Sequence, residues 1–272
     1  MGGLFGSKTI HNEANKVANF LINSATYGVT VPVIYGTTRI AGNIIDWFDF
    51  TAHAHTQTQG GKGGGRKVKN TTYTYTVAVL IGLCEGPIKG VGRIWKDKEV
   101  YVSLDAFNRD GMPFYGLTLF KGTHGQEPWS YTQSKYPEKA LPYSGLAYMA
   151  GVVDLGTNGG LPNLNFEVAG MLTETGDGVD ANPADVINYI VFDAVNGIGF
   201  GAGGIDSAGL NRLRTFCKAA DLLISAPPTS ENKKAYEIIN DICKLTNTIG
   251  FWSQNKLKLV PLCDERLEKD GI

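Results

Sequence analysis

The sequence predicts an α+β protein, with one or more β-rich, barrel-like domains followed by a smaller α+β module of about three helices and a hairpin. Three observations lead to this class. Glycine supplies 35 of the 272 residues, which favours turns and hairpins over long helices. Alternating and β-branched runs dominate the first part of the chain, and capped helices with an apolar stripe follow. The predicted parts are an N-terminal segment, a β-rich domain, an α+β domain and a polar tail or truncation point, at 1–24, 25–172, 173–264 and 265–272.

The β-rich part begins after a short helix-like stretch at 12–21. Strands are predicted at 30–35, which is rich in β-branched residues, and at 39–50, which is rich in aromatic residues. The clearest strand is 71–83, which starts with strict alternation and ends as a continuous apolar run. That change predicts one solvated face near its start and burial on both faces near its end.

A hairpin and two further strands complete the β-rich part. The run 91–102 predicts a hairpin with its tip at 96–98. The stretch 103–143 is irregular and rich in glycine, proline and aromatic residues. Strands are expected again at 146–153 and, after a proline turn, at 161–168.

The smaller module opens with a clear helix signal. Asn182 is a good capping residue, and Pro183 suits the first helical position. This helix is expected to run to about Val195. Two further helices and two short strands are predicted at 207–220, 230–245, 249–252 and 256–262.

The segment 51–70 (TAHAHTQTQGGKGGGRKVKN) is polar, glycine-dense and basic, without a hydrophobic period. It predicts a long exposed hairpin tip or a flexible loop. It does not match a phosphate loop, because Lys62 is followed by glycine instead of Ser or Thr, and a strand follows instead of a helix. Two histidines alone do not complete a zinc site. The candidate assembly residues are His53, His55, Lys62, Arg66, Lys67 and Lys69.

Composition excludes several classes of partner. The net charge of −1 argues against general binding to nucleic acid or to an anionic membrane. The four cysteines form no C-x-x-C pair, so they are expected to be buried small side chains. No apolar run reaches the ~20 residues of a membrane span, and the start lacks a signal-peptide pattern. We therefore expect no cofactor, no metal and no stable membrane anchor, in a chain made in a reducing cytoplasm.

The sequence contains no recognisable catalytic motif, and we expect no catalytic residue and no enzyme. The glycine-rich run 197–201 follows a helix instead of a strand, so it predicts a helix stop and not a dinucleotide fingerprint. One alternative is a cell-wall-degrading hydrolase that uses a carboxylate such as Glu85 or Glu167. We expect both carboxylates to be structural.

A second alternative is a glycan- or receptor-binding module built on the aromatic-rich stretch 113–143. Aromatic rings can stack on sugars, but in such segments they more often pack against the protein itself. The side chains that could serve this role are Trp129, Tyr131 and Tyr136.

Several segments, in this order, resemble one family. They are 27–43 (YGVTVPVIYGTTRIAGN), 60–65 (GGKGGG) leading into 72–75 (TYTY), 83–88 (LCEGPI), 161–170 (LPNLNFEVAG), 182–187 (NPADVI) and 245–248 (LTNT). Together they resemble the N-terminal hub region of the tail-tip or baseplate-hub proteins of long-tailed bacteriophages, the family of the lambda tip attachment protein J. The resemblance covers about residues 25–262.

The resemblance implies a structural protein of the virion, made in the host bacterial cytoplasm. Members form a homotrimeric ring at the end of the tail tube. They contact distal tail proteins, the tube and the tape measure protein, and genomic DNA passes through them without sequence-specific binding. Members usually continue well beyond the position that corresponds to Ile272, and their distal parts carry the host-binding tip, so the resemblance does not extend to receptor binding.

In this setting the segment 51–70 is expected to be an assembly element that becomes ordered on its neighbours. Deleting residues 56–69 is then expected to leave the isolated domain folded and to impair assembly.

Overall fold

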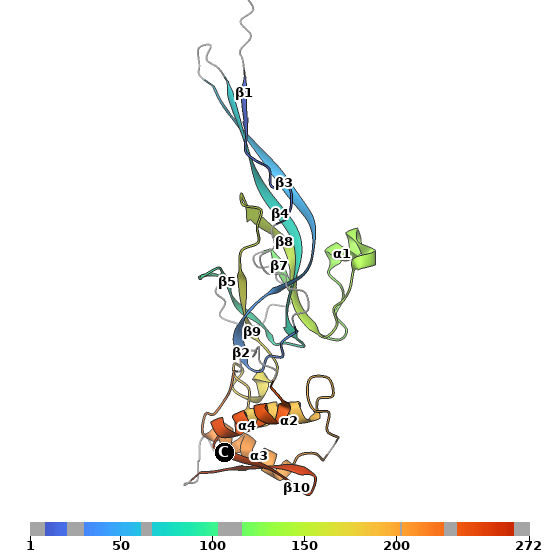
Figure 1. Cartoon of the computed structure of the whole chain (residues 1–272), viewed down its shortest axis with the longest axis vertical. Coiled ribbons are helices and arrows are strands. Elements are labelled where there is room, and N and C mark those ends of the chain that lie inside the picture. Colours follow the sequence, from blue (N-terminus) through green and yellow to red (C-terminus); the bar gives the residue numbers. More distant parts are fainter. Residues whose placement is uncertain are drawn as a thin grey trace, which may run out of the picture.

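The computed structural model describes residues 9–20, 30–60, 67–102, 116–201, 203–225 and 233–263. A long β arm projects from one end of the molecule, and helices gather at the other end (Figure 1). The strands form a five-stranded sheet, a four-stranded sheet and a separate hairpin. The α+β class is confirmed, and over the described ranges the sheets are open and do not close into a barrel.

The five-stranded sheet is built around β4, which is antiparallel to β3 on one edge. Its other edge pairs with β8 near the body and with β1 near the tip, and β7 follows β8. The predicted change of character along β4 is confirmed, because burial is continuous from Val77 to Cys84 and incomplete before it. The strands are β1 (Ile10–Glu13), β3 (Asn43–Gln59), β4 (Val68–Glu85), β7 (Leu117–Lys121) and β8 (Leu146–Gly156).

The four-stranded sheet has the order β2-β9-β5-β6 and packs on one face of the larger sheet. Their shared core contains Val79 and Ile81 from β4 and the fully buried Phe166 from β9. The chain crosses from one sheet to the other at Gly42, which divides the predicted strand 39–50. The strands are β2 (Thr37–Ala41), β5 (Gly90–Lys96), β6 (Glu99–Val102) and β9 (Leu164–Ala169).

The opposite face of the larger sheet is covered by the segment that follows β7. Trp129 at the start of α1 packs there with Phe48, Leu80 and Tyr148. Part of the stretch predicted to be irregular is therefore ordered, while 103–115 lies outside the described residues. The ordered elements besides β7 are α1 (Ser130–Lys135) and the single-turn η1 (Pro137–Lys139).

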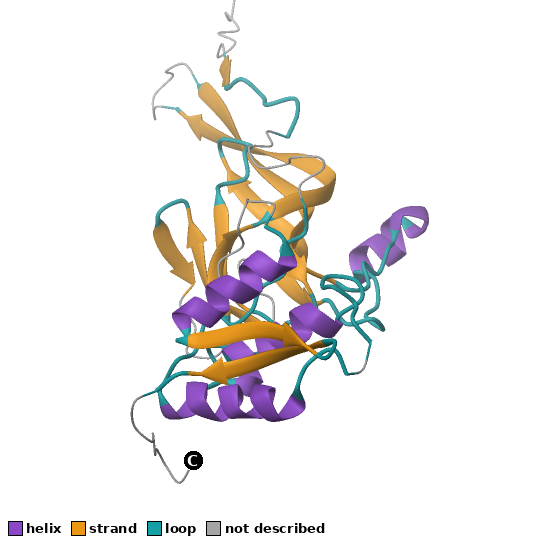
Figure 2. Ribbon diagram, turned by 60° about the horizontal axis from the view of Figure 1, so that its bottom comes forward, coloured by secondary structure: helices purple, strands orange, loops and turns teal. Residues whose placement is uncertain are grey.

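The C-terminal module has its own core and the predicted three helices and hairpin. Asn182 caps the first helix as predicted, and Asp193 ends it early by accepting bonds from the backbone N–H groups of Val195 and Asn196. Figure 2 shows the hairpin lying against the helices. After the single turn η2 (Thr173–Thr175), the elements are α2 (Pro183–Phe192), α3 (Ser207–Ala219), α4 (Ala235–Leu245), β10 (Thr248–Ser253) and β11 (Lys256–Pro261).

Two predictions near the N-terminus are wrong. No helix forms over 12–20, because residues 10–13 pair with β4 where β8 no longer covers its edge. No strand forms over 30–35, where Pro32 lacks a backbone N–H and only a single bridge forms at Tyr35. Within the described ranges, no helix is long and apolar enough to cross a membrane.

Candidate functional site

The arm is the end of the β3–β4 hairpin, and it includes most of the segment 51–70. Residues 51–59 pair with 68–76 without interruption. Of the two alternatives predicted for 51–70, the exposed hairpin tip is confirmed over the described residues and the flexible loop is not. Composition left both open because neither face of this ribbon is apolar, although its Thr and Tyr residues favour a strand. Lys62 and Arg66 lie outside the described residues.

One face of the arm is a ladder of polar side chains joined by hydrogen bonds. His53 Nε2 lies 2.8 Å from Thr76 Oγ1, and His55 Nε2 lies 2.8 Å from Thr74 Oγ1. Both rings therefore lie on one face, as their spacing predicts. In the described part of the chain, no three His, Cys, Asp or Glu side chains gather as a metal site would require.

The other face ties the arm to the N-terminal strand and the body. The Tyr73 hydroxyl donates to the Glu13 carboxylate on β1, and the Val17 N–H donates to the Tyr75 hydroxyl at 2.8 Å. The rings of Tyr75 and Phe50 stack with their centroids 5.3 Å apart. These contacts hold the arm in one direction relative to the sheets.

The candidate residues Lys67 and Lys69 lie where β4 begins, beside β1. The Lys67 carbonyl accepts a hydrogen bond of 2.8 Å from the Ile10 N–H, and Lys69 lies opposite His11 in the parallel pair. The structure therefore brings four candidates, His53, His55, Lys67 and Lys69, onto one ribbon.

The outer edge of β3 is the most unusual feature of the arm. Among the described strands, β3 pairs with β4 alone, so its other edge presents unpaired N–H and C=O groups. Its outer part, 51–59, contains no charged residue, proline or glycine, and its side chains are almost all exposed. Free edge strands usually carry charged residues or proline, which hinder pairing with a strand of another chain. This edge is therefore suited to pairing.

The aromatic residues considered for glycan binding are used in packing. Trp129 is 9% exposed and stacks on Tyr131 at 4.7 Å, and Tyr136 stacks on Phe48 at 4.8 Å. The hydroxyls of Tyr131 and Tyr136 donate to Asp49 and lower the pKa of its carboxyl group. This cluster fastens α1 to β3, and ring faces engaged in this way are poorly placed to stack on a sugar.

Of the two carboxylates considered for hydrolysis, that of Glu167 has a structural partner. Glu167 on β9 accepts from the Arg93 N–H at 3.0 Å and from Arg93 Nε at 2.9 Å. These bonds lower the pKa of Glu167, whereas a general acid needs a raised one. Glu85 ends β4, and its backbone N–H donates to the Pro32 carbonyl at 2.9 Å.

The Glu167–Arg93 pair gives a testable dependence of stability on pH. Because the pKa of Glu167 is lower in the folded state, its contribution to stability is complete above the unfolded pKa of about 4.3. That contribution is lost as the pH falls through the folded pKa. Chemical unfolding is expected to show the wild type losing more stability on acidification than Glu167→Gln. Parallel curves for the two proteins would contradict this.

One of the segments that carry the family resemblance, 27–43, contributes residues to the junction of the two core regions. Tyr35 bridges to Met171, and the Thr37 N–H donates to Ser225 Oγ at 2.7 Å. The Thr37 hydroxyl donates to the Val179 carbonyl at 2.7 Å. These motif residues therefore hold the β-rich part against the helical module.

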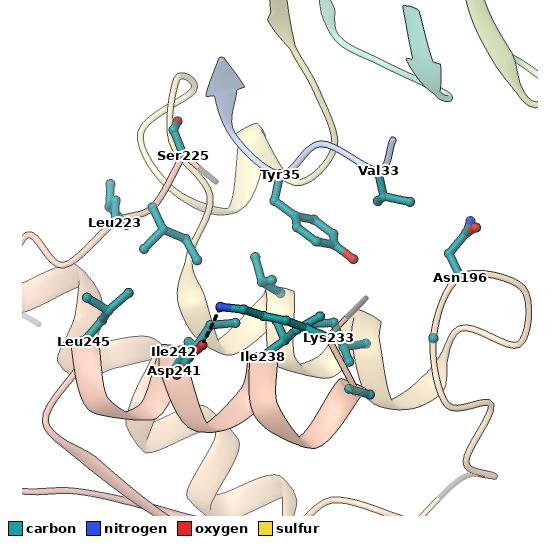
Figure 3. A pocket seen from close by; sticks show the side chains of 15 residues that line it. Val33, Tyr35, Asn196, Leu223, Ser225, Lys233, Ile238, Asp241, Ile242 and Leu245 are labelled. Atoms are coloured by element: carbon teal, nitrogen blue, oxygen red, sulfur yellow. Dashed lines mark hydrogen bonds and ion pairs between the residues drawn. The ribbon is translucent and has the colours of Figure 1, made fainter. Parts of the chain in front are cut away.

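A cavity of about 700 Å³ lies at this junction (Figure 3). Its walls include Tyr35 and, from α4, Ile238 and Ile242. Lys233 and Asp241 form an ion pair of 3.1 Å beside it. Burial raises the pKa of Tyr35, so its hydroxyl stays protonated. The lining suits an apolar group, and sequence patterns did not reveal it because its walls come from distant segments.

The helical module carries most of the exposed apolar side chains of the described chain. Of the seventeen exposed large hydrophobic side chains in the described ranges, eleven lie between Val179 and Leu262. Ile249 and Phe251 on β10 and Val260 on β11 belong to this set, and Trp252 contacts Phe200 at 5.3 Å. Exposed apolar groups at this density are typical of surfaces that bind other proteins.

Comparison with known proteins adds little. No family model matches the sequence, and no curated protein matches it. A solved structure described as the virion of a native gene transfer agent particle is similar to it, with 19% identity and a TM-score of 0.46. The match covers 85% of this chain and 51% of that chain, so this chain spans about half its length. A likeness this distant carries no argument about function.

Proposed function

We propose that the chain is a structural component of a bacteriophage tail tip. In this role it forms the trimeric hub that closes the tail tube and through which DNA is ejected. It performs no catalysis, and it contacts distal tail proteins, the tube and the tape measure protein. The identity of the assembly rests on the ordered sequence segments that resemble hub proteins.

The observation that carries the structural role is the projecting arm with its uncovered, uncharged edge. In a free monomer an edge of this kind favours aggregation, because it can pair with strands of other chains. In a subunit of a fixed assembly the same edge can pair with a neighbouring subunit. The exposed apolar side chains of the helical module add further surface suited to burial in an assembly. A net charge of −1 keeps repulsion between copies small.

The two alternatives receive less support. A hydrolase would need an acid with a raised pKa, whereas the carboxyl of Glu167 is held ionised by Arg93. A glycan-binding module would need free ring faces, whereas the aromatic rings around α1 stack on one another.

Shortening the arm is expected to block assembly and leave the fold intact. His55 and Thr72 are directly opposed, so a two-residue Asn-Gly turn can replace 56–71 between them. This variant is preferable to deleting 56–69, which would leave Asn70 and Thr71 without strand partners. The variant loses the strands of the arm tip, and β1 loses its partners 68–71. The body should still unfold cooperatively at a temperature close to that of the wild type, while complementation of a phage that lacks the gene should fail. Normal tails from the shortened variant would contradict a role for the arm in assembly.

The place of the chain in the particle can be tested directly. Antibody against the chain, carrying gold, should label purified phage particles at the distal end of the tail. Label on the capsid, or none on intact and disrupted particles, would contradict the proposed function.

A further inference from the structure

We infer that copies of this chain join by strand addition, with β1 of one copy pairing antiparallel with the free edge of β3 in the next. This inference rests on the proposed function, because it says how the subunits of the proposed ring meet. It concerns the described strands β1, β3 and β4 of the arm.

The tip of the arm has three strands in four matched rows. Residues 10–13 of β1 lie opposite 68–71 of β4, and 68–71 lie opposite 56–59 of β3. Each row therefore runs across β1, β4 and β3, as in Asn12, Asn70 and Gln57. The three-stranded tip ends in two open edges, one on β1 and one on β3.

The directions of these strands make the two edges complementary. β1 is parallel to β4, and β3 is antiparallel to β4. A copy that is rotated about an axis along the arm keeps its strand directions, so its β1 runs opposite to β3 of the first copy. The pairing is therefore antiparallel, and it uses different surfaces on the two copies, which is the kind of contact that closes into rings.

The lengths of the two edges also fit a closed arrangement. A sheet closes only if neighbouring strands are staggered. The edge of β3 over 51–59 is longer than the four residues of β1, so β1 of the neighbour can shift along it. Ile10 is 39% exposed on β1 and would gain cover from the neighbouring strand.

The occupant is a second copy because the chain itself supplies the matching edge. A foreign strand would leave the edge of β1 open, and two β3 edges paired about a two-fold axis would leave both β1 edges open. Only the pairing of β1 with β3 closes every edge at the tip.

Paired cysteines provide the test, in the full chain with the exposed Cys263 replaced by serine. Asn12 and Gln57 lie in one row, with β4 between them, so they are too far apart for a disulfide within one chain. Asn12→Cys is combined in turn with Cys at His53, His55, Gln57 or Gln59, which share its face of the sheet. Matched controls carry Asn12→Cys with Thr56→Cys or Thr58→Cys, on the opposite face.

On mild oxidation, at least one same-face pair is expected to give a disulfide-linked ladder that ends at the trimer on a denaturing gel. The opposite-face pairs and the single variants should remain monomeric on the gel. Cross-linking by Gln57→Cys or Gln59→Cys alone would indicate two-fold pairing of β3 and overturn the inference. A ladder of equal strength from both faces would also overturn it.

A second variant separates this inference from the proposed function. Gln57→Lys with Gln59→Lys places two charges on the edge and should weaken self-association severalfold, with the fold unchanged. Thr123→Lys with Gln133→Lys adds the same charge at exposed positions away from both the arm and the helical module, and should have no effect. If the variant with Gln57→Lys and Gln59→Lys still forms the trimer, and the paired-cysteine variants give no cross-links, strand addition is overturned and the hub proposal still stands. A chain that stays monomeric in all variants and in the wild type would count against both.

Discussion

Replacing Gly36 with alanine is expected to lower the free energy of unfolding by about 3 kcal/mol. Gly36 has φ +71°, in the left-handed region that favours glycine. A Cβ atom there would lie 2.5 Å from Ser225 Oγ and 2.6 Å from the Ile224 carbonyl oxygen. The substitution therefore strains the backbone and pushes apart the two core regions at their junction. Urea unfolding measures the effect.

Gly156→Ala is the matched control for this change. Gly156 has φ +61° and nothing within 4 Å of its added Cβ, so alanine there adds the backbone strain alone, about 1 kcal/mol. The difference between the two variants isolates the steric clash at the junction. Equal losses of stability would mean that Gly36 does not hold the junction together.

Asn182→Ala is expected to cost about 3 kcal/mol, because it removes a helix cap and leaves buried polar groups without partners. The Asn182 side chain is fully buried. Its Oδ1 accepts from the Ala184 N–H at 3.0 Å, and its Nδ2 donates to the Arg214 carbonyl at 3.1 Å. One side chain therefore starts α2 and fastens it to α3. Thermal and chemical unfolding would both show the loss.

A second cap provides the comparison. Asp206 accepts from the Gly209 N–H at 2.8 Å at the start of α3, in a less buried place. Asp206→Ala should cost about 1 kcal/mol, since water can replace the lost bond. If Asn182→Ala lowers the free energy of unfolding no more than Asp206→Ala does, the buried hydrogen bond from Asn182 to α3 does not stabilise the fold beyond an ordinary helix cap.

The parts of the fold that sequence could predict are those in which local pattern and tertiary structure agree. The apolar run in β4 and the cap at Asn182 are examples. Burial on both faces requires a continuous run of apolar residues, and capping requires a short polar side chain, so both can be recognised from the sequence. The three helices and the last hairpin follow for the same reason. In β1 the four residues carry no such mark, and pairing with β4 decides their conformation.

The candidate site was predictable only in part. The sequence drew attention to 51–70 by its unusual composition, but composition alone could not distinguish a loop from a ribbon exposed on both faces. Residues 51–59 form a strand because they pair with 68–76, and this pairing depends on the sheet in which β4 is held by β8. The junction cavity left no pattern at all, because Tyr35 and Ile238 meet only in the folded chain.

We propose above that this chain is a self-associating structural subunit. The most direct test is the mass of the purified chain in solution, measured by light scattering, with negative-stain images of the same sample. We expect a mass three times the 29.3 kDa of one chain and rings with three-fold symmetry. A monomer at all concentrations, including in the presence of the tail tube and distal tail proteins, would contradict it.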